Sequence, residues 1–172
     1  MTRMTADVVP IAPEHIESYR RAVDIVARER RYLTLLEAFP LPQTRAFVLS
    51  LMEKGDSMFV ALAKGEVVGW CDIQRHPFPA HSHRGTLGMG VVPDYRARGI
   101  GRRLIDQALN RAFAAGLVRV ELSVRADNTR AIRLYEKFGF VREGVARAAV
   151  FVDGEFHDTI AMALIDRRPQ ST

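Results

Sequence analysis

The residues best suited to bind an anion lie in one turn, Arg96-Ala97-Arg98-Gly99-Ile100-Gly101. The turn stands between a predicted strand that ends near Val92 and a predicted helix that begins near Ile100. Glycines have no Cβ and let backbone N–H groups converge on a ligand, and a helix N-terminus adds partial positive charge. Arg102 and Arg103 follow directly. The pattern predicts a phosphate or pyrophosphate site, although the glycines could instead only shape a turn among solvated arginines.

Two other phosphate-binding motifs do not fit this turn. A P-loop requires lysine followed by serine or threonine after its last glycine, whereas Arg102 and Arg103 follow Gly101. A dinucleotide fingerprint requires a third glycine, which neither Gly88-Met89-Gly90 nor Gly99-Ile100-Gly101 supplies. The sequence therefore gives no support to hydrolysis of a nucleoside triphosphate or to binding of a nicotinamide or flavin.

Hydrophobic periodicity and turn residues predict the elements that position this turn. Strands are expected over 8–11, 58–63, 67–73, 86–92, 118–124, 140–152 and 155–164, and helices over 13–39, 42–55, 100–116 and 128–139. A crossover helix joins strands 86–92 and 118–124, which are therefore expected to be parallel. This order predicts an α+β or α/β domain of three layers over residues 1–172, with helices flanking a mixed sheet.

Composition limits the partners and the compartment. The chain has 25 basic and 20 acidic residues, a net charge of +5, and one cysteine, Cys71. A single cysteine forms no internal disulfide and fits a reducing compartment, so a cytoplasmic location is expected. Because Cys71 has no cysteine partner for a metal ion, no metal site is expected. The chain shows no secretory signal and no run of about 18 apolar residues, so no membrane association is expected.

Several motifs occur together and in a fixed order. Arg96-x-x-Gly99-x-Gly101 follows a strand that ends in Val-x-Pro, and Asn128 precedes Tyr135 by seven residues, with Tyr-Glu-Lys-Phe-Gly-Phe at 135–140. Together they resemble the GNAT superfamily of N-acetyltransferases, in motif over residues 86–142 and in element order over the whole domain. The resemblance implies the GNAT fold: an α+β domain with a mostly antiparallel sheet of about seven strands and a V-shaped splay between the fourth and fifth.

The resemblance also implies a co-substrate and its binding residues. Acetyl-CoA would place its pyrophosphate in the glycine turn and pair its pantetheine arm with the preceding strand. Asn128 would reach the same arm, or simply cap a helix, or do both. The cofactor-binding residues expected are Met89, Gly90, Val91, Arg96, Arg98, Gly99, Ile100, Gly101, Arg102 and Asn128.

Acyl transfer to an amine needs a neutral amine, a stabilised oxyanion and a proton for the departing thiolate. Tyr135 matches the family's general acid, although it could also be a core tyrosine, and a backbone amide around Gly90 or Val91 would stabilise the oxyanion. Ser123 stands where ribosomal-protein acetyltransferases of this family often have a glutamate. Glu121 lies on the same strand face and could act as base through water, or could be a solvated glutamate. The other candidate bases are Asp72, His76, His81 and His83.

The acceptor is expected to be the primary amine of a small or amino-acid-like molecule, attacking directly in a ternary complex. Its specificity would come from the first two helices, their connection and the loops, which contribute Arg30, Arg31, Tyr32, Glu37, Phe39, Phe78 and Phe151. Trp70 and Cys71 are expected to be core residues.

Three alternative functions accompany this expectation. The chain could acetylate protein N-termini or lysines, or it could be a non-catalytic acyl-CoA sensor. Nucleic-acid binding is not expected, because the arginines are scattered and no aromatic array accompanies them.

A homodimer would be unsurprising for the family, since the final hairpin offers an edge for strand pairing.

Overall fold

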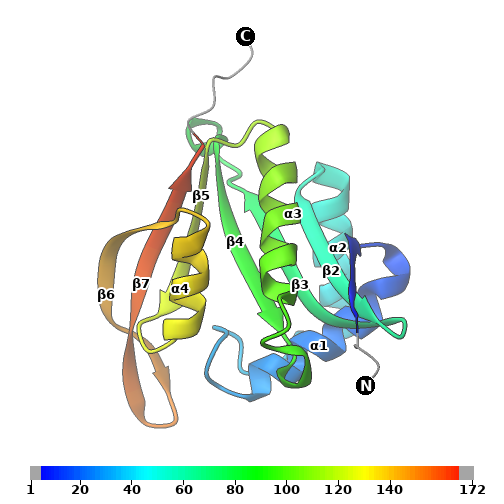
Figure 1. Cartoon of the computed structure of the whole chain (residues 1–172), viewed down its shortest axis with the longest axis horizontal. Helices are drawn as coiled ribbons and strands as arrows, with labels where there is room; N and C mark the ends of the chain where they lie inside the picture. Colours follow the sequence, from blue (N-terminus) through cyan, green and yellow to red (C-terminus); the bar gives the residue numbers. More distant parts are fainter. Residues whose placement is uncertain (1–4, 167–172) are drawn as a thin grey trace.

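A computed structural model describes residues 5–166 of the chain, so the ends of the predicted 1–172 domain lie outside the described residues. Seven strands in this described part of the chain form one sheet in the order β1-β2-β3-β4-β5-β7-β6 (Figure 1). The strands are β1 (Asp7–Pro10), β2 (Ser57–Ala63), β3 (Glu66–Arg75), β4 (Arg84–Val91), β5 (Arg119–Arg125), β6 (Val141–Val152) and β7 (Glu155–Ile165). All pairings are antiparallel except β4 with β5, which confirms the predicted mixed α+β architecture.

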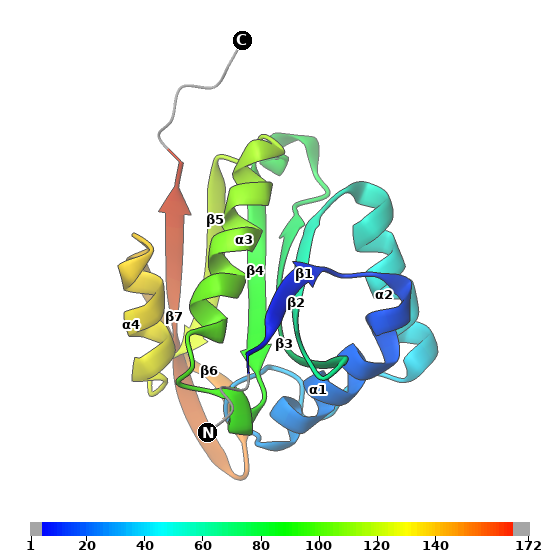
Figure 2. The same ribbon diagram turned by 45° about the vertical axis from the view of Figure 1, so that its right-hand side comes forward.

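Within residues 5–166, four α-helices cover the two faces of the sheet. They are α1 (Ile16–Arg28), α2 (Leu41–Lys54), α3 (Ile100–Ala114) and α4 (Thr129–Lys137), with short 3-10 turns η1 (Pro13–His15), η2 (Pro79–His81) and η3 (Pro93–Tyr95). Helices α1 and α2 lie on one face, and α3 and α4 lie on the other (Figures 1 and 2). Each of α1 and α3 buries one apolar stripe against the sheet, and the side chains of Ile16, Val26, Leu104 and Ile105 are almost completely buried.

The parallel pair β4–β5 is short. Its register covers only Arg84–Thr86 against Arg119–Glu121, after which the two strands diverge (Figure 1). Strand β5 continues along β7 and β4 continues along β3, so the sheet remains continuous on both sides of the opening. The predicted splay between the fourth and fifth strands is confirmed.

The prediction of one helix over residues 13–39 is wrong in its second half. Helix α1 ends at Arg28, and the N–H of Arg30 donates to the carbonyl of Ala27 at 2.9 Å while Arg30 takes a left-handed φ of 56°. The chain then crosses to α2 as an irregular connection over residues 29–40, named here the α1–α2 connection. Side-chain hydrogen bonds hold its far end: Asp24 accepts from the N–H of Ala38 at 2.9 Å, and Arg20 donates to the carbonyl of Phe39 at 2.7 Å.

Candidate active site

A groove of about 720 Å³ follows the opening between β4 and β5. Its walls come from β4, from the turn that leads into α3, from the outer half of β5 and from α4. Nearly all the residues predicted to bind the cofactor line this groove, namely Met89, Gly90, Val91, Arg96, Gly99, Ile100, Gly101, Arg102 and Asn128. Distant stretches of the sequence are thus brought to one cleft.

Strand β4 presents backbone groups to the groove. The N–H of Val92 donates to the carbonyl of Val68 on β3 at 2.9 Å. Because backbone direction alternates along a strand, Gly90 and Gly88 also face β3, whereas Val91, Met89 and Leu87 face away from it. Beyond Thr86 the described register gives β4 no partner on that second side, so these groups can pair with an extended ligand.

Gly90 allows β3 and β4 to pack closely at this point. A Cβ placed on Gly90 would lie 2.3 Å from the Cη2 atom of Trp70, a separation that real Cβ atoms do not show. The indole of Trp70 therefore occupies the space that any larger residue at 90 would need. The absence of a side chain at residue 90 therefore lets the ring of Trp70 pack against β4.

The turn before α3 has the backbone form needed for anion binding. Gly99 takes a left-handed φ of 75° and Ala97 one of 61°, and the N–H of Arg103 donates to the carbonyl of Gly99 at 3.2 Å to start the helix. The preceding amides of Ile100, Gly101 and Arg102 belong to the first helical turn, where N–H groups have no partner within the helix. The turn lies along the groove and favours negative charge.

The arginine side chains of this turn have different surroundings. Arg96 donates to the carbonyl of Val91 at 2.8 Å, pairs with Glu29 at 2.8 Å and stacks over Tyr32, its guanidinium 4.7 Å from the ring centroid. Arg96 therefore fixes the end of β4 to the α1–α2 connection. Arg98 stacks on Tyr95 at 5.4 Å and lies outside the groove lining found among residues 5–166.

Tyr135 reaches the groove from α4. Its side chain is 7% exposed, and burial, with a smaller effect of nearby Cys71, raises the pKa of the phenol. A phenol that remains protonated throughout the neutral range can donate a proton but cannot act as a base there. Asn128 also lines the groove, and its Oδ1 accepts from the N–H of Ala131 at 3.2 Å, so it does cap the helix.

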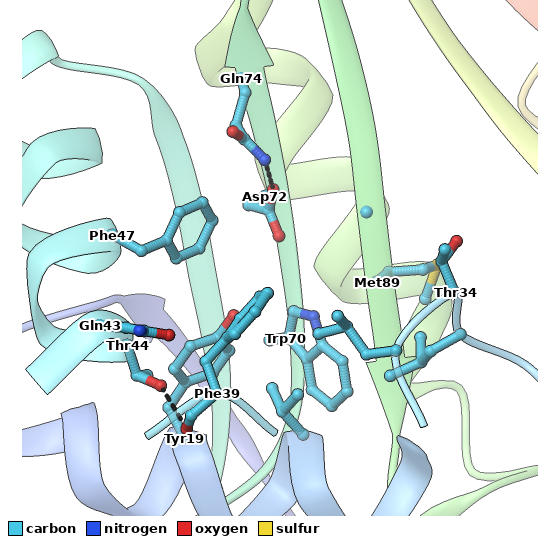
Figure 3. Close-up of a pocket in the computed structure, with 14 residues that line it drawn as sticks. Tyr19, Thr34, Phe39, Gln43, Thr44, Phe47, Trp70, Asp72, Gln74 and Met89 are labelled. Carbon is cyan, nitrogen blue, oxygen red and sulfur yellow. Dashed lines mark hydrogen bonds between the residues drawn. The ribbon is translucent and has the colours of Figure 1, made fainter. Parts of the chain in front are cut away.

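A second cavity, of about 560 Å³, lies on the α1–α2 side of the sheet. Figure 3 shows Trp70, Asp72 and Gln74 on β3 facing Phe39 and Phe47. The wall is mostly apolar and aromatic. The two cavities share the wall residues Leu33, Thr34, Gly88 and Met89, so the second cavity adjoins the groove along β4.

Asp72 is the acidic residue in this wall. Its side chain is 4% exposed, and its Oδ2 accepts a hydrogen bond from Gln74 Nε2 at 3.1 Å (Figure 3). Burial raises the pKa of Asp72 to about 7, opposed by the Gln74 hydrogen bond and assisted by the charge of Asp56. Asp72 is paired in register with Gly88 of β4, and a Cβ on that glycine would lie 3.4 Å from Asp72 Oδ1. The carboxylate thus lies beside the shared wall.

Glu121 lies elsewhere, in an ion-pair network. It accepts from Arg84 at 2.7 and 2.9 Å and from Arg119 at 2.7 Å, and it lies 3.1 Å from His76 Nε2. Burial opposes its charge, but the hydrogen bonds from the two arginines outweigh this and lower its pKa to about 2. The structure does not bring Glu121 to the lining of either cavity as defined by the described residues. So weak a base would have little tendency to take a proton from an amine.

The other candidate bases and specificity residues divide between the cavities and the surface. His76 and His81 stack edge to face, with ring centroids 5.8 Å apart, in the loop before β4. Of the predicted acceptor residues, Phe39 lines the second cavity and Tyr32 lines the groove. Trp70 is a buried residue, as predicted, and also forms part of the cavity wall. Sequence reasoning missed Gln43 and Phe47 on α2, and it missed the Leu33–Leu35 stretch, which the prediction placed inside one helix over 13–39.

Two further features concern metals and membranes. Within residues 5–166, no group of three or more His, Cys, Asp or Glu side chains is arranged to hold a metal ion. None of the helices in the described part of the chain has the length and apolar character needed to cross a membrane.

Comparisons with known proteins agree with this geometry. The sequence profile of the acetyltransferase (GNAT) family matches residues 20–140. The L-amino acid N-acetyltransferase AaaT of Escherichia coli (strain K12) is 30% identical over 90% of this chain and 98% of its own length. The N-alpha-acetyltransferase RimI of Mycobacterium tuberculosis (strain ATCC 25618 / H37Rv) is 36% identical over 88% of this chain and 91% of its own length.

Solved structures show the same fold. An acetyltransferase from Salmonella typhimurium, solved with acetyl-CoA, superposes with a TM-score of 0.90 at 15% identity, covering 98% of each chain. A phosphinothricin acetyltransferase from Sinorhizobium meliloti, also in complex with acetyl-CoA, gives a TM-score of 0.88 at 20% identity, over 94% of this chain and 89% of its own.

Proposed function

Because the chain belongs to the acetyltransferase (GNAT) family, we propose that it transfers the acetyl group of acetyl-CoA to the primary amine of a small molecule, by direct attack in a ternary complex. The observation that carries this proposal is the groove itself. Along one cleft it combines a strand whose outer side has no strand partner in the described register beyond Thr86, a turn suited to anions and a protonated tyrosine.

The residues of the groove fit acetyl-CoA. The outward-facing backbone groups of Met89 and Val91 suit an extended amide chain such as pantetheine, and the amides of Ile100, Gly101 and Arg102 suit a pyrophosphate. The carbonyl of Val91 already accepts a hydrogen bond from Arg96. We therefore propose that the N–H groups of Met89 and Val91 are the groups that donate hydrogen bonds to the bound acetyl-CoA. One of them would stabilise negative charge on the thioester oxygen during attack. Gly90 faces β3 and is less suited to this role than the sequence suggested.

The chain must also move protons. An acceptor R–NH₃⁺ first loses one proton to a base, and the neutral nitrogen then forms a bond to the acetyl carbon while the C–S bond breaks. The Tyr135 hydroxyl donates its proton to the departing sulfur, and the second proton of the nitrogen restores the tyrosine directly or through water. The net products are an N-acetylated amine, a thiol and one released proton, so atoms and charge balance.

A second candidate function is acetylation of a protein N-terminus, which the likeness to RimI favours. The second cavity favours a small acceptor, because residues 33–35 of the α1–α2 connection line it together with residues of α1, α2 and β3. Ser123 lines the groove at the position where the resemblance leads one to expect a glutamate in ribosomal-protein acetyltransferases. We therefore place the small-molecule reaction first.

The test follows release of free thiol from acetyl-CoA with a panel of primary amines and of peptides. We expect turnover with the amines, and we expect Tyr135→Phe to lower kcat by roughly 10²-fold while calorimetry finds acetyl-CoA affinity unchanged. Binding of acetyl-CoA without turnover of any acceptor would instead identify a sensor. Turnover confined to peptides would favour the second candidate.

Three earlier expectations stay predictions. The homodimer has a suitable surface, since β6 is an edge strand that pairs with β7, and Val145 and Phe151 are 61% and 62% exposed. Light scattering after gel filtration decides it. The cytoplasmic location and the absence of a nucleic-acid partner likewise await fractionation and binding measurements.

A further inference from the structure

The second cavity has an unusual balance of charge. Its described lining includes one carboxylate, that of Asp72, and no arginine, lysine or histidine. Aromatic rings of Phe39, Phe47 and Trp70 surround much of the remaining space. A buried carboxylate whose single described hydrogen bond comes from a neutral amide, Gln74, is poorly compensated. Such a group gains from a cationic ligand.

The position of Asp72 connects the cavity to the proposed reaction. Asp72 lies opposite Gly88, which belongs to the wall of both cavities, as does the next residue, Met89. Met89 is also one of the two proposed donors to the thioester oxygen. An amine held by Asp72 from the cavity side would therefore stand next to the part of β4 where the acetyl group is expected.

We propose, on the basis of the proposed function, that the acceptor is a primary amine with an apolar or aromatic body and no carboxylate. Asp72 binds its ammonium group, and Phe39, Phe47 and Trp70 enclose its hydrocarbon part. The polar wall residues Thr34 and Gln43 are neutral.

The charge balance argues against an α-amino acid. In such an acceptor the carboxylate is attached to the same carbon as the amine, so binding the amine to Asp72 brings two negative groups within a few ångströms. Like charges at this distance repel, and the described lining offers no cation to pair with the second one. The chain would differ in this respect from AaaT, whose name specifies L-amino acids.

Asp72 can also serve as the base. Its pKa of about 7 lies near neutrality, where a general base is most effective. Around it, Tyr19 on α1 and Cys71 on β3 have pKa values that burial raises, so both are neutral, while Asp56 adds negative charge from the turn before β2. The Asp72 carboxylate would accept one proton from the ammonium group and pass it to water.

Matched acceptors test the class of substrate. 2-Phenylethylamine and phenylalanine differ by one carboxylate, and so do 3-methylbutylamine and leucine. We expect kcat/KM to be at least tenfold higher for the amine of each pair. Equal or higher kcat/KM for the amino acids would overturn this inference while leaving the acetyltransferase function intact. Failure to acetylate any amine, despite binding of acetyl-CoA, would overturn the proposed function itself.

Variants test the role of Asp72. Asp72→Asn should abolish calorimetric binding of 2-phenylethylamine and lower kcat/KM by at least 10²-fold, with acetyl-CoA affinity unchanged. The matched control is Asp56→Asn, which removes a nearby carboxylate outside the described lining and should preserve amine binding. Gln43→Arg adds a cation to the wall and should shift the ratio of kcat/KM values toward the amino acid. Unchanged amine binding in Asp72→Asn would contradict the assignment.

Discussion

Asp72 illustrates how one residue can lower stability where function needs it. An aspartate whose pKa rises from its ordinary 3.8 to about 7 on folding holds a proton more tightly in the native state than in the unfolded one. The contribution of the protonated Asp72 carboxyl to the free energy of unfolding is therefore fully present below pH 3.8. It is lost as the pH rises through 7. Each pKa unit corresponds to about 1.4 kcal/mol, so the ionised carboxylate costs the fold a few kcal/mol at pH 8.

A stability measurement on Asp72→Asn follows from this. Asparagine has the same shape and no charge to bury, so we expect the variant to melt several degrees above the wild type at pH 8. The difference should shrink as the pH falls and vanish below about pH 4, where Asp72 is protonated in both states. Thermal melts at pH 4, 6 and 8 check it. A variant that melts lower than the wild type at every pH would show that the carboxylate stabilises the fold.

For single residues, the sequence predicts the chemical role of a side chain better than it predicts which other residues surround it. The Arg96–Gly101 turn and Asn128 could be selected by type and spacing, because anion binding and helix capping depend on local backbone geometry. Tyr135 was selected by its match to the general acid of the family that the sequence resembles. Asp72 could only be one of several candidate bases. One feature could have distinguished Asp72 from the other candidates: it lies inside the buried run Trp70–Ile73, and a buried aspartate is rare without a role. What the sequence lacked was the cavity, which residues distant along the chain create.

Among the elements, β4 and β5 are held together at the end where they still pair by ion pairs as well as by backbone hydrogen bonds. Strands β4 and β5 share only three residue pairs, and Glu121 joins Arg84 of β4 to Arg119 of β5. Arg119 also pairs with Glu143 of β6 at 2.6 Å. The network thus links three strands where the two halves of the sheet meet. Glu121 belongs to the framework that positions the groove.

Glu121→Gln should therefore lower stability and leave catalysis unchanged. Losing hydrogen bonds between charged groups that are mostly buried costs roughly 1.5–3 kcal/mol, which lowers Tm by about 3–10 °C in a chain of this size. Since the pKa is lowered from 4.5 to about 2, this contribution is present above pH 4.5 and is lost as the pH falls through 2. Melting curves and thiol-release kinetics measure both effects.

Glu136→Gln provides the control for this network. It removes a surface pair with Arg142 whose side chains are 42% and 56% exposed, and it should change Tm very little. A fall of 10²-fold in kcat for Glu121→Gln, with Tm unchanged, would instead restore Glu121 as the base.

The elements also show where sequence patterns stop being informative. Helix α2 ends at Gly55 with φ 69°, as a glycine after an amphipathic run predicts. Helix α1 ends without glycine or proline, and Arg30 takes the left-handed conformation instead, with its side chain paired to Asp153 at 2.8 Å. That partner lies in the β6–β7 turn, far away in sequence, so no local pattern could place the end of α1. The error hid the connection that forms part of both cavities.

For the whole molecule, the sheet is in effect two sheets joined at one end. Strands β1 to β4 and strands β5 to β7 are each continuous, and beyond Thr86 nothing in the described backbone pairing holds them together. A ligand that pairs with β4 and reaches α4 would connect the two halves. Its binding energy would then add to the free energy of unfolding of the entire fold.

Acetyl-CoA should accordingly raise the melting temperature of the whole chain in a single transition. At a concentration one hundred times Kd, linkage adds about 2.7 kcal/mol, or roughly 5–10 °C. Glu121→Gln should start from a lower Tm and show the same shift, because its network lies outside the groove. Gly101→Asp should lose the shift, since it adds negative charge beside the proposed pyrophosphate site, where its Cβ would meet only the flexible ends of Met89 and Leu134 at 3.3 and 3.5 Å. An undiminished shift in Gly101→Asp would mean that acetyl-CoA does not occupy the turn.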